Sequence, residues 1–90
     1  MGVGKYQIYM NEKVKQLVRD YALEHLDKSD TIPEFNVYIV WHCYILGNAK
    51  WLLSTTLLDG MYYEITYNVT RNEFYLDAYK KFENRCIKNN

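Results

Sequence analysis

The sequence predicts a two-layer α+β domain: an N-terminal helix, an antiparallel β-meander of three to four strands and a C-terminal helix. Two observations support this fold class. Residues 36–68 are rich in β-branched and aromatic side chains, and the turn-forming pairs Gly47-Asn48 and Asp59-Gly60 interrupt them. On both sides of this stretch, apolar residues recur at three- and four-residue spacing, which is typical of helices.

Length and charge set further bounds. The 90 residues make one predicted domain, residues 1–90, and a chain of this size buries only about 60–65% of its unfolded surface, so its core is thin. Eleven basic and eleven acidic residues cancel to a net charge of zero. This balance argues against a protein that holds duplex DNA by general electrostatic attraction.

The sequence also predicts a compartment. The first residues carry no apolar run of signal-peptide length. The longest apolar stretch, Val37 to Leu46, is about half of the roughly 20 residues that a helix needs to cross a bilayer. We therefore expect a soluble, cytosolic protein that makes no membrane contact, with Cys43 and Cys86 as reduced thiols.

The first predicted element is an amphipathic helix from about Tyr6 to Lys28, in which Asn11 is a candidate N-cap. Residues 5–10 could extend this helix toward the N-terminus. Pro33 prevents the helix from continuing. Its apolar stripe, which we expect to face the sheet, consists of Met10, Val14, Leu17, Val18, Tyr21 and His25.

Three strands are predicted next, at Val37–Leu46, Lys50–Leu57 and Met61–Tyr67. The first is apolar on both faces, which is typical of a central strand or of one that is covered on both sides. Strict alternation places Trp41 on the same face as Val37, and Tyr38 on the opposite face together with Tyr44. The third strand alternates more cleanly, so one of its faces is expected to be buried.

Residues 74–88 have two interpretations. Phe74, Leu76 and Ala78 alternate as they would in a fourth strand, whereas Tyr75, Tyr79, Phe82 and Cys86 recur at helical spacing. We predict a short strand over about residues 73–76 that passes into a C-terminal helix ending near Ile87. The sequence does not decide between a strand and a helix for residues 74–88.

No group of residues indicates an enzyme. His42 and Cys43 are the only adjacent base and nucleophile, and neighbours in a strand point to opposite faces. The spacing of the two cysteines and two histidines matches no zinc signature, and Gly47 and Gly60 are single turn glycines rather than a phosphate-binding loop. We therefore predict no catalytic residue, no metal ligand and no cofactor.

The surplus of aromatic residues is the strongest functional indication. Tyrosine and tryptophan side chains that a thin core cannot hide serve as anchors at protein interfaces. We expect a non-enzymatic protein that binds a protein partner, and the candidate contact residues are Tyr38, Tyr44, Tyr62 and Tyr75. The alternative is a single-stranded nucleic-acid-binding protein, in which bases stack on these rings beside Lys50 and Arg71. The sequence is also compatible with a homodimer, and with a small ligand bound at its interface.

Two runs, Asp59–Asn68 and Tyr75–Asn84, resemble an uncharacterised family of small proteins encoded by phages and prophages of Gram-positive bacteria. The segments Val37–Trp41 and Trp51–Thr55 are similar to earlier strands of that family. The resemblance implies a phage or prophage origin and action in the bacterial cytoplasm. It transfers no catalytic or binding residue. Small accessory proteins of this origin are expected to act on a host or phage partner, as an inhibitor or adaptor.

Overall fold

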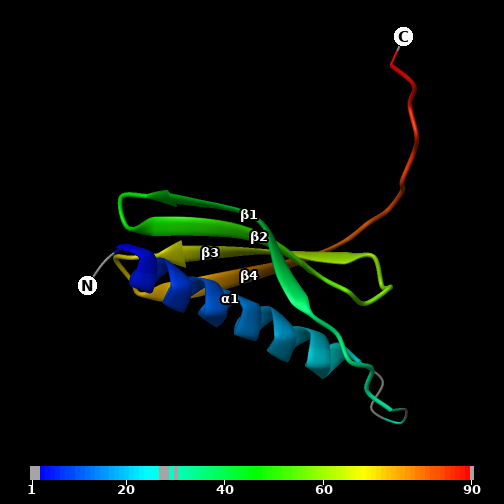
Figure 1. Cartoon of the computed structure of the whole chain (residues 1–90), viewed down its shortest axis with the longest axis horizontal. Coiled ribbons are helices and arrows are strands. Elements are labelled where there is room, and N and C mark those ends of the chain that lie inside the picture. The colour runs from blue at the N-terminus through cyan, green and yellow to red at the C-terminus, as the bar shows by residue number, and fades with distance from the viewer. Residues whose placement is uncertain (1–2, 27–28, 30, 90) are drawn as a thin grey trace.

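The computed structural model describes residues 3–26, 29 and 31–89 (Figure 1). Helix α1 spans Val3–His25, and the strands are β1 (Val37–Ile45), β2 (Asn48–Thr55), β3 (Met61–Asn68) and β4 (Glu73–Lys80). The strands form one antiparallel sheet in the order β1-β2-β3-β4. The α+β class, the N-terminal helix and the meander are therefore confirmed.

Helix α1 begins earlier than predicted. Its first residue is Val3, so Asn11 lies inside the helix and the N-cap prediction is wrong. The predicted end at Lys28 lies outside the described residues. Four side chains spaced four residues apart are buried, and they form the stripe that faces the sheet: Met10, Val14, Val18 and Ala22. His25, predicted at the end of this stripe, is exposed in the last turn.

The core lies between this stripe and the two central strands. Trp51 and Leu53 of β2, with Ile65 of β3, are fully buried, and Tyr63 is 2% exposed. Strands β2 and β3 alternate between buried side chains and side chains that are half-buried or exposed, because only one face of the sheet packs against α1. The predicted alternation of the third strand is confirmed.

Strand β1 contains a β-bulge that the sequence analysis did not anticipate. Ile39 pairs with Leu53, but Trp41 pairs with Leu52, so Val40 is an extra residue without a partner in the register. A bulge shifts the alternation of every later residue by one position. Strand β1 is also an edge strand, which corrects the prediction that it is central or covered on both sides.

The bulge decides which β1 side chains face α1. Strict alternation placed Trp41 on the same face as Val37, and Tyr38 on the same face as Tyr44. Both assignments are wrong. Tyr44 lies on the helix side with Val37, whereas Trp41 lies on the opposite face with Tyr38. His42 and Cys43 still point to opposite faces, as predicted, because both follow the bulge.

The turn between β1 and β2 is displaced by one residue from its predicted place. Leu46 and Gly47, rather than Gly47 and Asn48, connect the strands, and Asn48 is the first residue of β2. Both turn residues have positive φ, 51° for Leu46 and 82° for Gly47, as in the two-residue turns that match the twist of a hairpin.

The C-terminal helix is absent from the described residues. Strand β4 continues to Lys80, four residues beyond its predicted end, and the Lys81 amide donates to the Gly60 carbonyl at 2.7 Å. Residues 82–89 form no regular element and extend away from the sheet (Figure 1). The helix prediction is wrong because pairing with β3 satisfies the backbone of residues 77–80, whereas a short helix is marginal without packing.

Candidate protein-binding surface

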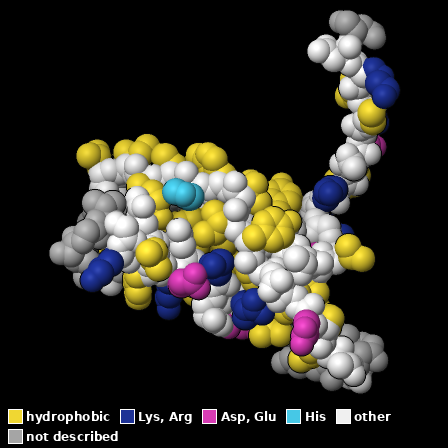
Figure 2. Space-filling view, viewed as in Figure 1, with side chains coloured by type: hydrophobic (Ala, Val, Ile, Leu, Met, Phe, Trp, Pro, Cys, Tyr) yellow, Lys and Arg dark blue, Asp and Glu magenta, His cyan; other side chains and the backbone are white. Residues whose placement is uncertain are grey.

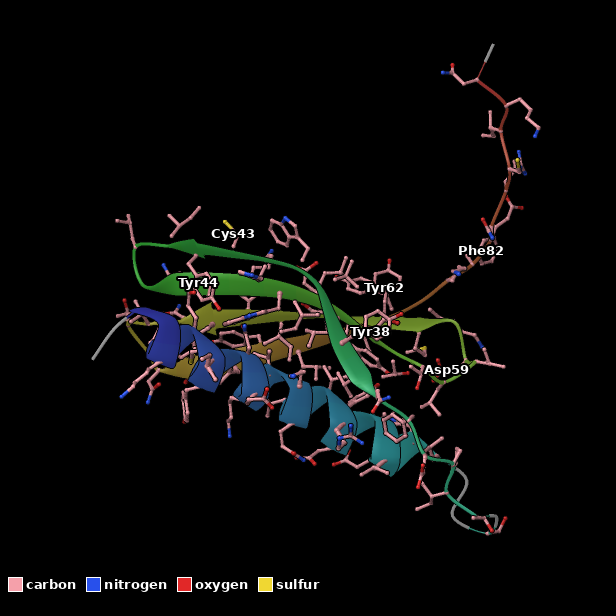
Figure 3. The ribbon with its side chains drawn as sticks, viewed as in Figure 1. Tyr38, Cys43, Tyr44, Asp59, Tyr62 and Phe82 are labelled. Carbon is pink, nitrogen blue, oxygen red and sulfur yellow. The ribbon has the colours of Figure 1, made fainter. Side chains whose placement is uncertain are left out.

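The sheet face opposite α1 is the candidate functional site, and we call it the open face. Each strand contributes every second side chain to it, apart from the step at the bulge. Figure 3 shows Cys43 pointing away from α1 and Tyr44 pointing toward it. The open face consists of Tyr38, Trp41, Cys43 and Ile45 of β1; Asn48, Lys50, Leu52 and Ser54 of β2; Tyr62, Glu64, Thr66 and Asn68 of β3; and Glu73, Tyr75, Asp77 and Tyr79 of β4.

A row of tyrosines crosses this face. Tyr38 pairs with Ser54, Ser54 with Tyr62, and Tyr62 with Tyr79, so the register brings side chains from four strands into one line. The rings of Tyr62 and Tyr79 stack with centroids 5.1 Å apart and planes at 15°. The three tyrosines are 39–47% exposed, so each ring is packed on one side and accessible on the other.

An apolar cluster lies farther along β1. Trp41 is 51% exposed and Ile45 is 64% exposed, with Cys43 between them on the same face. These three side chains border a shallow hollow of about 290 Å³, which Lys50 and Thr66 also line. The cluster and the tyrosine row together give the open face two separate sets of apolar anchors.

Charges lie between the anchors. Lys50 Nζ is 2.9 Å from Glu64 Oε1 near the middle of the face. The hydrogen bond that Lys50 donates to Glu64 raises the pKa of the Lys50 ammonium above its usual value. Asp77 is the principal cause of the raised pKa of Tyr79, and Tyr75 donates to the Glu73 carboxylate, which raises the pKa of Tyr75. The acidic groups of the open face therefore outnumber its single lysine.

Comparison with known proteins identifies a family. A model described as a family of unknown function, DUF6275, matches residues 11–89. The chain belongs to this family. No curated protein and no solved structure matches the chain. The matched residues include all four strands, so the open face is part of the DUF6275 domain.

The structure places four of the six predicted contact residues of this DUF6275 member on the open face: Tyr38, Lys50, Tyr62 and Tyr75. Tyr44 lies on the other side of the sheet, where its hydroxyl donates to Asn11 Oδ1 at 3.0 Å. Arg71 lies in the turn after β3, where its amide donates to Asn68 Oδ1 at 3.2 Å, so its backbone belongs to one end of the sheet.

The sequence analysis did not include Trp41 and Tyr79 among the candidate contact residues, although both lie on the open face. Trp41 reaches the open face only because of the bulge, and no local pattern signals that bulge. Tyr79 had a signal, because it follows Tyr75 and Asp77 with the two-residue period of a strand. Assigning residues 77–80 to a helix hid that signal.

The described residues of this DUF6275 chain do not form a metal site or pair His42 with Cys43. No three His, Cys, Asp or Glu side chains among them gather closely enough to hold a metal ion. His42 contacts the Tyr44 ring on the helix side, while Cys43 is on the open face, so they do not form a catalytic pair. Within the same residues, no helix has both the length and the apolarity for a membrane crossing.

Proposed function

We propose that the protein is a small non-enzymatic accessory protein that acts by binding another protein through the open face. Its partner is a host or phage protein, which it inhibits or links to another molecule. The observation that carries the proposal is the set of five open-face rings, Tyr38, Trp41, Tyr62, Tyr75 and Tyr79, which are 39–51% exposed. The resemblance noted above supports a phage or prophage origin and action in the bacterial cytoplasm.

The energetic reason is the cost of leaving these rings in water. Tyrosine and tryptophan are enriched among interface residues whose truncation weakens binding by about 2 kcal/mol or more. They add large apolar area with few rotatable bonds, so little conformational entropy is lost on binding. The stacked pair of Tyr62 and Tyr79 is held in place before any partner arrives, which lowers that entropy cost further.

The charges of the open face favour a protein partner over a nucleic acid. Binding of single strands requires cations beside the stacking rings. Lys50 is already paired with Glu64, and Glu73 and Asp77 add negative charge close to Tyr75 and Tyr79. A partner surface with basic or hydroxyl groups complements this pattern, because it can bond to the carboxylates without displacing the Lys50–Glu64 pair.

Capture from a bacterial host lysate with single variants of the full chain tests the proposal. Trp41→Ala and Tyr62→Ala each remove one open-face anchor, and Tyr9→Ala is the control because Tyr9 is 64% exposed on α1. We expect the wild type and Tyr9→Ala to retain the same partner, with at least a tenfold loss for both open-face variants. Recovery of nothing above background, or equal recovery with all four proteins, would refute the proposal.

An oligonucleotide titration tests the nucleic-acid alternative. A fluorescent single-stranded oligonucleotide at low salt should show no saturable binding, because the open face carries more negative than positive charge. Salt-dependent binding that weakens in Lys50→Ala or Arg71→Ala would establish the alternative instead. Circular dichroism of each variant checks that the fold is retained.

A further inference from the structure

The helix side of the sheet is only partly covered. Helix α1 approaches β1 and β2, and a helix about 10 Å wide covers about two strands spaced by about 4.8 Å. On β4, the helix-side residues Phe74, Leu76 and Ala78 are therefore only half-buried. A hollow of about 370 Å³ lies between α1 and β4, and we call it the side hollow; it is lined by Leu17, Asp20, Tyr21, Glu24, Phe74 and Leu76.

The C-terminal tail, residues 82–89, has the complementary chemistry. Phe82 is 102% exposed and Ile87 is 80% exposed, so both apolar side chains lie in water. Figure 2 shows Lys and Arg side chains on this part of the molecule. By sequence, the cations of residues 82–89 are Arg85 and Lys88. The side hollow has an apolar floor with two carboxylates, Asp20 and Glu24, whereas the tail has apolar side chains, two cations and one carboxylate, Glu83. Arg85 Nη2 is 3.0 Å from Glu83 Oε2, and because an exposed pair of this kind contributes little stability, Arg85 can exchange it for a carboxylate of the hollow.

We propose that the tail of one copy binds the side hollow of a second copy, and that the exchange is reciprocal and forms a two-fold dimer. Phe82 supplies the apolar anchor, and Arg85 and Lys88 lie against Asp20 and Glu24 of the second copy. Such a reciprocal contact buries the same two surfaces of each copy, as in the two-fold dimers that are the commonest homo-oligomers. This interface is on the opposite side of the sheet from the open face, so it does not depend on the proposed function.

Chain geometry assigns the Phe82 anchor to a second copy rather than to the hollow of its own chain. The bond from the Lys81 amide to the Gly60 carbonyl fixes the start of the tail at the far end of β4. Leu76 and Phe74 lie roughly 17–23 Å back along that strand, at about 3.3 Å per residue. Phe82 is a single Cα step of about 3.8 Å beyond Lys81, so it cannot reach back into its own hollow. The hollow of a second copy has no covalent link to this Phe82, so the distance along the chain does not limit the contact.

Charge reversal in the full chain tests the exchange. The variant Asp20→Lys/Glu24→Lys reverses the hollow, and Arg85→Glu/Lys88→Glu reverses the tail; all four side chains are on exposed residues, so the fold should be retained. Sedimentation velocity over a concentration series measures the dimer. We expect the wild type to dimerise, with at least tenfold weaker self-association of each variant. An equimolar mixture should regain the wild-type affinity, because both contacts then join opposite charges.

The controls separate this interface from others. Glu12→Lys/Glu34→Lys changes the net charge as much as the hollow variant does, but at exposed sites outside the hollow, and should leave the dimer unchanged. Phe82→Ala should also weaken the dimer at least tenfold without lowering the melting temperature. Trp41→Ala should leave the dimer intact, which distinguishes this inference from the proposed function.

Three results would overturn the inference. One is a wild type that stays monomeric throughout the concentration series. The second is a dimer that neither reversal weakens, since another surface would then form it. The third is a mixture of the two reversal variants that fails to regain affinity, together with a four-substitution chain that sediments as a more compact monomer than either reversal variant. That result would place the tail in the hollow of its own chain.

Discussion

Asn11 connects the two layers through a single oxygen atom. Its Oδ1 accepts hydrogen bonds from the Tyr44 hydroxyl at 3.0 Å and from Trp51 Nε1 at 2.9 Å. Asparagine is a weak helix former, and here it lies in the middle of α1. Its presence follows from the fully buried Trp51, whose indole N–H needs an acceptor in a place that water does not reach.

Replacing Asn11 should therefore destabilise the fold. Asn11→Ala leaves two donors without an acceptor, and we expect the free energy of unfolding to fall by about 1–3 kcal/mol. Tyr44→Phe removes only one donor and should cost less, because Trp51 keeps its bond. Urea denaturation measures both, with the exposed Lys13→Ala as the control. A loss for Asn11→Ala no larger than that of the control would contradict this role.

Two of the tyrosines with raised pKa values, Tyr44 and Tyr63, link stability to pH through their burial. Burial is the main cause of the raised pKa of Tyr63 and of Tyr44 in the folded state. Above the ordinary tyrosine pKa of about 10, the unfolded chain loses these protons while the folded chain still holds them. Their contribution to stability is thus complete below about pH 10 and is lost as the pH rises through the folded-state values.

We accordingly expect urea midpoints to fall as the pH rises above about 10. Tyr63→Phe should flatten this fall, since phenylalanine has no proton to lose. Midpoints measured across this range check the prediction. A slope in Tyr63→Phe equal to that of the wild type would rule it out.

Among the elements, the β1–β2 turn is the most strained. Leu46 holds a φ of 51°, a conformation that bulky residues avoid, and its side chain is 93% exposed, so no packing compensates for the strain. Gly47 follows with a φ of 82°, and a Cβ added there would lie 3.3 Å from both γ-carbons of Val69. The two turn positions therefore respond to substitution in opposite ways.

Leu46→Asn should stabilise the protein by about 0.5–1 kcal/mol, because asparagine tolerates positive φ and Asn-Gly is a preferred two-residue turn. Thermal unfolding followed by circular dichroism measures the change. The matched control is Leu58→Asn, which replaces another fully exposed leucine in a connecting segment. An equal gain in both variants would show that lost apolar exposure, not turn geometry, is responsible.

Gly47→Ala should destabilise the protein by at least 1 kcal/mol, since backbone strain and the contact with Val69 act together. Gly60→Ala is the comparison, because its φ is also positive but the nearest atom to an added Cβ is Lys81 Cβ at 3.8 Å. We expect the smaller loss at Gly60. Equal losses in thermal unfolding would mean that crowding at Val69 contributes nothing.

At the scale of the whole molecule, the sheet separates two environments. Its helix side holds the core, and its open face presents rings and paired charges. Strands β2 and β3 are hydrogen-bonded on both edges and carry most of the fully buried side chains, whereas β1 and β4 each have one unpaired edge. Local opening should therefore begin at the outer strands.

Amide hydrogen exchange should show this order. Amides of β2 and β3 that pair within the sheet, such as those near Leu53 and Ile65, should exchange last and only with global unfolding. Amides at the outer edges of β1 and β4 should exchange at least tenfold faster, since no neighbouring strand protects them. Slow exchange along the outer edge of β4 would instead indicate that another chain pairs with it.

The sequence by itself determined the helix stripe of α1, the alternation of β3 and the approximate positions of the turns, because each follows from a local period or a turn dipeptide. It also indicated Tyr38, Tyr62 and Tyr75 of the open face. Only the tertiary structure decided the remainder. The bulge at Val40 turns Trp41 outward, and pairing with β3 extends β4 to Tyr79. Both depend on which backbone hydrogen-bond partners the neighbouring strand provides, and a local sequence pattern does not contain that information.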